Sequence, residues 1–355
     1  MMKEIFRGVK VVELSSVLAG PAVGMFFAEL GAEVIKIENA TTGGDVTRSW
    51  KLPSEPQDAL GSAYFSSVNY AKTHVFFDLE NPEDQAKTLD LLRGCDVVIS
   101  NFKASAAKRL GVDYARLKAE NPKIIYAQIY GYDADDDTPA FDVVLQAETG
   151  FMHMNGERGG KAVKMPVALI DILAAHQLKE AILIALLQRE RTGLGAFVST
   201  SLYAAAVASL ANQATNWLMA GKIPQRMGSE HPNIAPYGDV FETKDDLEIV
   251  LACGTERQWK NLCDALNLVD LKTDNLFKTN SLRVQNRQKL ADILRGCILT
   301  FERTILLNLL KQNNVPAGAI RTMNEVFDNP LAQAMILESG EGKRVKTVAF
   351  TIIGH

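Results

Sequence analysis

The stretch that decides the fold is GVKVVELSSVLAGPAVGMFFAELGAEVIKIE, residues 8–38. Its apolar run at 8–14 predicts a buried strand, residues 20–31 predict a helix that stops at Gly31, and residues 32–38 predict a second strand. The three elements make a tight β-α-β unit. The first turn, SSVLAGP, lacks the G-x-G-x-x-G fingerprint, so it does not predict a dinucleotide site.

The same alternation continues along the chain. Further strands are expected at 73–80, 95–102 and 123–132, with helices at about 82–92 and 103–119 between them. Strands that alternate with helices favour a parallel, doubly wound sheet. The expected fold class is therefore α/β, with a large Rossmann-like domain.

The pattern changes in the second half of the sequence. Long helices are expected at about 171–191 and 201–220, and the Pro- and Gly-containing stretch at 222–238 is interpreted as a linker. Two strand-like runs within 238–254 predict a hairpin, and amphipathic helices follow it. We expect a second, smaller α+β domain at roughly 226–325.

Composition excludes several classes of protein. The chain has 355 residues, of which 47% are hydrophobic and 23% charged, as in globular proteins of about two domains. A formal charge of −4 does not predict nucleic-acid binding, and no apolar run reaches the ~18 residues expected of a membrane span. Four scattered cysteines and an N-terminus without an apolar signal region predict reduced thiols in a cytoplasmic protein.

No metal site is expected. The five histidines form no close pair with ligand spacing. The acidic run DADDD at 133–137 is interpreted as a solvated loop, because one local run supplies too few ordered ligands. A Ser/His/Asp triad is defined by geometry, so the sequence leaves it open, although no motif points to one.

One acid, Asp171, stands inside the apolar stretch PVALIDIL at the start of the long helix. An ionised carboxylate is costly to bury unless something binds or uses it. The local sequence favours a helix N-cap, in which Asp171 accepts backbone N–H bonds of a helix at 172–190. A nucleophile is the alternative, because the N-terminus of a helix helps to keep a carboxylate ionised.

Several blocks in one order resemble the family III CoA-transferases, the group that includes formyl-CoA transferase, crotonobetainyl-CoA:carnitine CoA-transferase and alpha-methylacyl-CoA racemase. The blocks cover nearly the whole chain. They are GVKVVELSSVLAGP with ELGAEVIKIE and GGDVTRSW, CDVVISNF to IYGY at 95–132, PVALIDIL to VSTSL at 166–202, PYGDVF to KNLC at 236–263, and NNVPAG to PLAQA at 313–334.

The resemblance implies a fold and an assembly. We expect a large CoA-binding domain at 1–225, a small domain at 226–325 and a C-terminal segment at 326–355 that returns to the large domain. Two chains are expected to interlock as a homodimer, with the active site completed by both. Relatives usually continue into a further tail after KTVAFTIIGH, so the end of the large domain is expected to be short.

The resemblance also assigns roles. The family's nucleophilic aspartate corresponds to Asp171, which would form an anhydride with the acyl group and then a thioester with CoA. The resemblance implies no metal and no permanently bound cofactor. CoA or acyl-CoA is the expected substrate. Asp142 matches a supporting acid near the active site, with a loop or helix cap as its alternative. The CoA site is expected to include Leu18, Ala19, Lys72, Asn101, Phe102 and Arg109.

Some positions depart from the family pattern. Thr73 replaces the second basic residue beside Lys72, and Asn39 stands where relatives often have arginine. The racemase branch uses a histidine just before Asp142, and here that residue is Phe141, which cannot carry a proton. Racemisation of a 2-methylacyl-CoA and non-catalytic CoA binding remain the alternatives to CoA transfer. The sequence does not identify the donor and acceptor acids.

Overall fold

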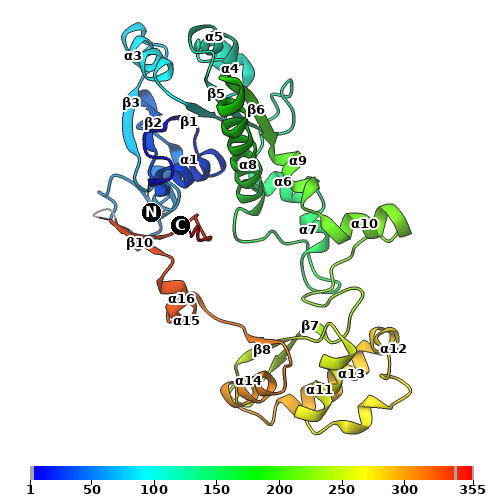
Figure 1. Cartoon of the computed structure of the whole chain (residues 1–355). Helices are drawn as coiled ribbons and strands as arrows, with labels where there is room; N and C mark the ends of the chain where they lie inside the picture. The colour runs from blue at the N-terminus through cyan, green and yellow to red at the C-terminus, as the bar shows by residue number, and fades with distance from the viewer. Residues whose placement is uncertain (1–3, 340–341, 354–355) are drawn as a thin grey trace. The chain divides into compact units, whose positions relative to one another are not determined.

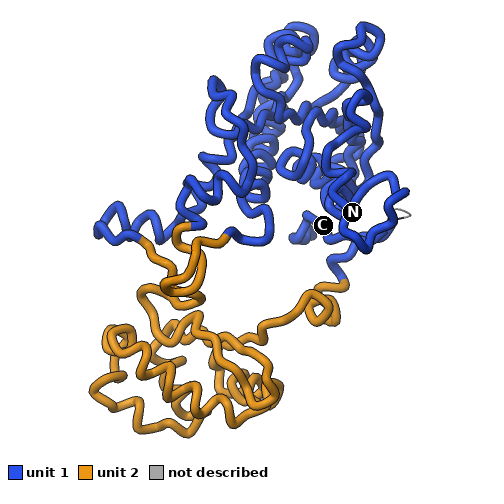
Figure 2. Tube along the Cα trace, turned by 180° about the vertical axis from the view of Figure 1, so that it is seen from behind, with its two compact units in different colours: residues 1–152, 164–223, 334–355 blue, residues 153–163, 224–333 orange. Residues whose placement is uncertain are grey.

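The computed structural model describes residues 4–339 and 342–353. The chain forms two compact units: residues 1–152, 164–223 and 334–355 make up the first, and 153–163 with 224–333 the second (Figure 2). The three-part division into 1–225, 226–325 and 326–355 stays a prediction, and its residues 1–3, 340, 341, 354 and 355 lie outside the described part.

The first unit is built on a six-stranded parallel sheet with the order β3-β2-β1-β4-β5-β6 (Figure 1). Its strands are β1 Lys10–Leu14, β2 Glu33–Asn39, β3 Thr73–Phe77, β4 Val97–Ser100, β5 Ile125–Tyr130 and β6 Ala196–Ser201. This order is that of a doubly wound sheet, whose strands run outward in both directions from the β1/β4 pair. The predicted α/β class with a large parallel sheet is confirmed.

Helices cover both faces of this sheet, which is why its strands are apolar on both sides. Val11 belongs to the core shared with α1 and α8, whereas Val12 belongs to the core on the opposite face. The covering helices are α1 Ala19–Glu29, α6 Asp142–Glu148, α8 Leu169–Thr192 and α9 Leu202–Ala208 on the first face, and α3 Pro82–Arg93, α4 Ala104–Arg109 and α5 Tyr114–Glu120 on the second.

Strand β6 is absent from the sequence prediction, and the helix predicted after it was wrong in one detail. The helix expected at 201–220 is two helices, α9 and α10 Ala211–Ala220. The strand depends on Gly195, where a Cβ would lie 1.9 Å from the carbonyl oxygen of Ile124, the residue directly before β5. Only glycine allows this approach, and it brings the strand after α8 against β5.

The second unit has a three-stranded antiparallel sheet of order β7-β8-β9, with β7 Tyr237–Glu242, β8 Glu248–Ala252 and β9 Ala317–Ala319. It confirms the predicted hairpin and the smaller α+β unit. Helices α11 Glu256–Ala265, α12 Asn280–Gln285, α13 Arg287–Ile298 and α14 Arg303–Gln312 accompany it. Buried Trp259 and Phe277 lie in the core that these elements share.

The remaining elements are short. They are η2 Ala40–Thr42, η3 Val46–Ser49, α2 Ala63–Ser66, α7 Phe151–Met154, η4 Val269–Lys272, α15 Met323–Phe327, α16 Pro330–Gln333, β10 Ile336–Ser339 and β11 Gly342–Val345. Within 4–339 and 342–353, no helix combines the length and apolar character needed to cross a bilayer.

The segment after β11 is tied to the first helix of the large unit. The Glu29 carboxylate, at the end of α1, accepts hydrogen bonds from the Thr347 N–H (2.7 Å), the Thr347 hydroxyl (2.8 Å) and the Val348 N–H (3.1 Å). Val348 is buried in the core that contains α1. These contacts join parts of the chain that are 318 residues apart.

A buried group of charges lies under the carboxyl ends of β1 and β2. Glu13 and Lys36 are direct partners in the strand register, and the Lys36 Nζ lies 2.8 Å from Glu13 Oε1 and 3.1 Å from Asp45 Oδ2. The Lys72 Nζ lies 2.7 Å from Glu13 Oε2. All four side chains are at most 1% exposed. The two positive and two negative charges offset one another, and each partner is needed to keep the others from being buried unpaired.

We predict that Lys36→Met lowers the free energy of unfolding by about 3–5 kcal/mol, because it removes one partner from a buried charge group. Urea unfolding followed by circular dichroism measures the change. Arg7→Met is the matched control: Arg7 pairs with Glu4 where both side chains are mostly exposed, and the substitution should change stability by less than about 1 kcal/mol. Equal effects of the two substitutions would contradict the prediction.

Candidate active site

The edge where β1 and β4 end is the crevice of the large sheet. Connections leave β1 and β4 in opposite directions, and ligands of doubly wound sheets bind at this point. Two neighbouring pockets occupy it, an inner pocket of about 250 Å³ and an outer pocket of about 580 Å³. They share Ser16 and Phe102, so together they form one elongated groove.

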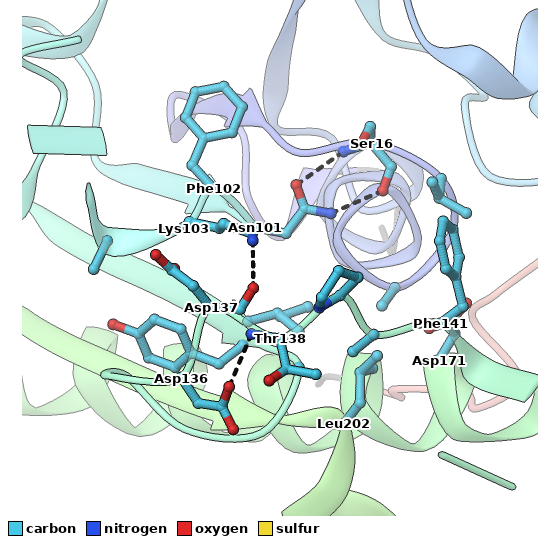
Figure 3. A pocket seen from close by; sticks show the side chains of 18 of the residues that line it. Ser16, Asn101, Phe102, Lys103, Asp136, Asp137, Thr138, Phe141, Asp171 and Leu202 are labelled. Carbon is cyan, nitrogen blue, oxygen red and sulfur yellow. Dashed lines mark hydrogen bonds between the residues drawn. The ribbon is translucent and has the colours of Figure 1, made fainter. Parts of the chain in front are cut away.

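The inner pocket is formed by the loop after β1, the loop after β4 and the segment before α6 (Figure 3). Its lining residues are 16–19, 101–104, 129–131, 134, 136–141, Asp171 and Leu202. The predicted site residues Leu18, Ala19, Asn101, Phe102 and Asp171 all lie here. The structure thus brings together residues that are up to about 150 positions apart in the sequence.

Asp171 is the third residue of α8, and it is 8% exposed. The interpretation of Asp171 as an N-cap was wrong: the helix begins at Leu169, Ala168 is the N-cap, and no side chain caps it. Within the described part of the chain, no hydrogen bond reaches the Asp171 carboxylate. Burial, followed by the nearby charge of Asp142, raises the pKa of Asp171 to about 7. The carboxylate is therefore partly protonated at neutral pH.

Asp142 stands at the first position of α6, where it is buried beside the start of α8. Gln146 Nε2 donates to both of its oxygens, at 2.8 and 2.9 Å, and the Ile170 amide also interacts with the carboxylate. Burial raises the pKa of Asp142. Because Ile170 directly precedes Asp171, Asp142 fixes the first turn of α8 and acts electrostatically on the candidate nucleophile.

Asn101 lines the inner pocket, and Phe102, the next residue, lines both pockets. Asn101 holds the loop after β1: its Oδ1 accepts the Ser16 N–H at 3.2 Å, and its Nδ2 donates to the Ser16 carbonyl at 3.0 Å (Figure 3). Phe102 lines both pockets and offers an aromatic face to an elongated ligand. The loops after β1 and β4 are therefore joined to each other at the centre of the groove.

Arg109 lines the outer pocket, far along the groove from Asp171. Its side chain is mostly exposed, and its guanidinium pairs with the Glu80 carboxylate. A planar group of several donors suits phosphate oxygens, and an exposed ion pair is weak enough to exchange for them. Asn39 lies in the same pocket, but its Oδ1 is used locally, to accept from the amide and hydroxyl of Thr41.

Lys72 lines neither pocket. It is fully buried, and its Nζ donates to Glu13 Oε2 (2.7 Å), the Pro21 carbonyl (2.8 Å) and Asn69 Oδ1 (2.9 Å). Burial lowers the pKa of Lys72 to about 8. All three donors of the ammonium are used within the protein, so Lys72 has no free donor for CoA in this geometry. Direct contact between Lys72 and CoA stays a prediction. Thr73 begins β3 and also lies outside both pockets.

Other lining residues were not predicted from the sequence. Lys103 follows Phe102 in the inner pocket, and its ammonium donates to the Asp137 carbonyl (Figure 3). Asp136 and Asp137 belong to the run interpreted as a solvated loop; they are exposed, but they also form part of the pocket wall. Among the described residues, no group of three or more His, Cys, Asp or Glu side chains is arranged to hold a metal ion.

The sequence as a whole matches known proteins. The model of CoA-transferase family III matches residues 6–352. The chain belongs to this family. It is 37% identical to succinate–glutarate CoA-transferase of Agrobacterium fabrum over 99% of this chain and 90% of that protein. It is 34% identical to succinyl-CoA:glutarate CoA-transferase of Homo sapiens over 94% and 76%, and 33% identical to acetyl-CoA:oxalate CoA-transferase of Acetobacter aceti over 94% and 86%.

Two solved structures have the same fold as this CoA-transferase. A CAIB/BAIF family protein from Brucella suis matches with a TM-score of 0.85 and 36% identity, covering 98% of this chain and 93% of that chain. The structure of Rv3272 from M. tuberculosis matches with the same TM-score and 30% identity, over 98% and 93%. The predicted family membership and the class of enzyme are therefore confirmed.

Two residues bear on the racemase branch of this family. Phe141 is the N-cap of α6; it is more than half exposed and lines the inner pocket, where a phenyl ring cannot transfer a proton. Glu256, in the stretch GTERQW that resembles a racemase segment with an acid at this position, lies in the second unit, where it forms an ion pair with buried Arg283 at 2.7 Å. The bond to Arg283 is the main cause that lowers the pKa of Glu256, so this carboxylate is held ionised within its own unit.

We predict that kcat/KM for CoA transfer falls as the pH drops below about 7, because protonation removes the nucleophilic form of Asp171. Asp142→Asn removes a neighbouring negative charge and so lowers the pKa of Asp171. The ratio of the rate at pH 6 to the rate at pH 8 should then be larger in Asp142→Asn than in the wild type. Asp90→Asn, an exposed change on α3, should leave this ratio unaltered; an unaltered ratio in Asp142→Asn would contradict the coupling of the two acids.

Proposed function

We propose that this enzyme moves CoA from an acyl-CoA to a carboxylic acid through covalent intermediates on Asp171. The observation that carries the proposal is the buried Asp171 carboxylate, which has no hydrogen-bond partner among the described residues. It lies at the inner end of an elongated groove, and the chain belongs to family III. Glu13 is even more buried but is neutralised by two lysines, so burial alone does not distinguish Asp171. Its position in the groove and its unpaired carboxylate do.

The proposed reaction is a sequence of acyl transfers. Asp171 attacks the thioester carbonyl carbon, the C–S bond breaks, and CoA leaves as a thiolate with a mixed anhydride on the enzyme. The thiolate then attacks the aspartyl carbonyl carbon and releases the donor acid as a carboxylate, so that Asp171 carries CoA as a thioester. The acceptor carboxylate attacks the carbonyl carbon of this thioester, the C–S bond breaks, and CoA leaves again as a thiolate with a second anhydride on the enzyme. The thiolate attacks the acceptor acyl carbon and restores the Asp171 carboxylate.

This chemistry explains why the site tolerates an unpaired carboxylate. Each step exchanges one activated acyl group for another, so no ATP is consumed and no net proton is released. Removal of water strengthens the nucleophile and protects the anhydrides from hydrolysis. A carboxamide at position 171 would keep the shape but lose the nucleophile.

We propose that the groove binds the whole CoA molecule. We place the thioester beside Asp171, the pantetheine arm along Leu18, Ala19 and Phe102, and the nucleotide phosphates near Arg109. In this placement CoA is a substrate and not a resident cofactor. Asn101 contributes by holding the loop, and Lys72 by neutralising Glu13 under it.

The named relatives support short dicarboxylic acids as the substrates. Their names contain succinate with glutarate, succinyl-CoA with mesaconate, and acetyl-CoA with oxalate. We propose that at least one of the two acids exchanged by this enzyme is a dicarboxylate of this size. Racemisation of a 2-methylacyl-CoA is not favoured, because the residues that line the inner pocket include no histidine to act with Asp171.

We predict that brief incubation with succinyl-CoA or glutaryl-CoA followed by hydroxylamine or borohydride leaves a mass change on Asp171. Intact-mass spectrometry and peptide mapping measure it. Dicarboxyl-CoA donors should label faster than acetyl-CoA or a branched acyl-CoA. Asp171→Asn should bind CoA but carry no label, and its transfer rate should fall at least about a thousandfold, as expected when a covalent nucleophile is lost.

The matched control for that experiment is Asp142→Asn, which should still be labelled at position 171, because the nucleophile itself is unchanged. Binding of CoA without labelling by any donor would remove the nucleophile from Asp171 and favour the non-catalytic alternative. Exchange of solvent deuterium at the α-carbon of a 2-methylacyl-CoA would instead restore the racemase.

We also propose that the enzyme acts as a homodimer in the cytoplasm. The support for a dimer is the apolar surface of two helices. In α10 no residue is buried, and Leu218 and Met219 are 78% and 83% exposed; in α8, Ile184 and Leu187 are also exposed. Apolar patches of this kind mark protein–protein contacts more often than free surface.

We predict that Leu218→Asp together with Met219→Asp shifts the protein from dimer to monomer, since it puts two charges into an apolar contact. Size-exclusion chromatography with light scattering measures the mass, and the transfer assay should show a parallel loss of activity. Leu60→Asp is the control, because Leu60 is 91% exposed in a loop outside these two helices. A wild type that is monomeric and active would overturn the proposed dimer.

A further inference from the structure

The loop between β1 and α1 is held by side chains from three other elements. The Lys36 Nζ donates to the Ser15 carbonyl at 2.5 Å, Asn101 bonds both the N–H and the carbonyl of Ser16, and the Asp45 carboxylate accepts the Val17 N–H at 3.1 Å. Three successive residues therefore have main-chain groups that are fixed from outside the loop. This density of side-chain contacts is far greater than an ordinary connection needs.

Val17 has a backbone conformation that explains the need for these contacts. Its φ is +71°, in the left-handed region that glycine adopts freely and β-branched residues avoid. Such a conformation persists only where the surrounding structure holds it in place. The residue that follows, Leu18, begins α1 as its N-cap, without a side-chain cap of its own. The path of the chain into α1 is thus set at Val17.

Asp45 is well placed to hold Val17. It is 6% exposed, and its carboxylate also accepts the N–H (3.0 Å) and the hydroxyl (2.8 Å) of Thr47 and pairs with Lys36 (3.1 Å). Its own N–H donates to Glu38 at 2.8 Å. The orientation of the Asp45 carboxylate is therefore fixed before any ligand arrives, and its charge is offset by the lysine.

We propose that Asp45 is a positioning residue for CoA: by holding the amide of Val17, it keeps residues 16–19 in the single shape that forms the wall of the inner pocket beside Asp171. The inference rests on the proposed function, because it takes CoA as the ligand of the groove. It assigns to Asp45 no contact with the reacting atoms. The loop would otherwise relax to a conformation with negative φ at Val17 and move Leu18 and Ala19 out of the wall.

A direct electrostatic role for Asp45 predicts the opposite sign. Asp45 also lines the outer pocket, and a carboxylate there would repel the phosphates of CoA. Removal of a repelling charge tightens binding, whereas loss of a positioning contact weakens it. The direction of the change in CoA affinity therefore separates the two roles.

The test compares five variants of the full chain with the wild type by calorimetric titration with CoA. They are Asp45→Ala, Asp45→Asn, Val17→Gly, Asp45→Ala with Val17→Gly, and Asp45→Ala with Val17→Ala. We expect Asp45→Ala to weaken CoA binding about tenfold, within the range that backbone strain of this kind produces. Asp45→Asn keeps an acceptor oxygen and should stay within about threefold of the wild type.

The decisive comparison is in the Asp45→Ala background. The double variant Asp45→Ala with Val17→Gly should bind CoA within about threefold of the single variant Val17→Gly. Glycine adopts the left-handed conformation without a holding contact, so the loss of Asp45 should no longer matter. Val17→Ala removes much of the same side chain but keeps the strain, so it should not restore binding. In steady-state kinetics Asp45→Ala should raise KM about tenfold and leave kcat within about threefold, since Asp171 itself is unchanged.

Three results would overturn the inference: tighter CoA binding in Asp45→Ala, no rescue by Val17→Gly, or a loss in Asp45→Asn as large as that in Asp45→Ala. If Asp45→Ala does not fold, the expected retention of affinity in Asp45→Asn still stands as the test. Wild-type protein that binds no CoA would instead overturn the proposed function, and this inference with it.

Discussion

The buried contact between the Glu13 carboxylate and the Lys36 ammonium is the constraint on which the rest of the site depends. The two residues face each other in neighbouring parallel strands, so the pair fixes the register of β1 against β2. A shift of one residue would place the two side chains on opposite faces of the sheet and leave both charges buried without their partner, at a cost of several kcal/mol. The same ammonium holds the Ser15 carbonyl and the Asp45 carboxylate. Strand register, loop shape and the wall of the groove are thus linked through one nitrogen atom.

The site places two buried acids in opposite electrical environments. Burial acts to raise the pKa of Glu13, but Lys36 and Lys72 outweigh it, and the net pKa is lowered. Asp171 has burial and the charge of Asp142 acting in the same direction. Glu13 is therefore a fixed negative charge that supports structure, while Asp171 is a carboxylate whose ionised form is held at a cost in stability. In the proposed mechanism, the reacting carboxylate is the one that the fold leaves without a counter-charge.

The sequence predicts the parts of this arrangement that depend on pattern. The β-α-β unit at 8–38 follows from apolar periodicity, and Asp171 is conspicuous as an acid in an apolar run. Strand β6 could not be predicted, because half of the residues in AFVSTS are polar and the close backbone approach at Gly195, which brings it to β5, is not visible in the sequence. The start of α8 was misplaced because tertiary contacts, including the interaction of Asp142 with Ile170, extend the helix beyond its polar residue. The Glu13–Lys36 pair was readable in principle, since opposite charges stand at matching positions of VVEL and VIKIE. The role of Asp45 could not be predicted in this way, because Asp45 holds the main-chain amide of Val17, and a sequence does not show which side chain reaches a given amide.

The bond between Glu29 and Thr347 has a consequence for folding during synthesis. Helix α1 is made early in synthesis, but the residues that bind its end are 318 positions later. At roughly 5–20 residues per second, a ribosome needs on the order of 15 to 60 seconds to make that interval. Throughout this time the nascent chain exposes the apolar surface that Val348 later covers. The polypeptide must therefore wait in a partly assembled state, a period in which chaperones have both the time and the surface to bind it.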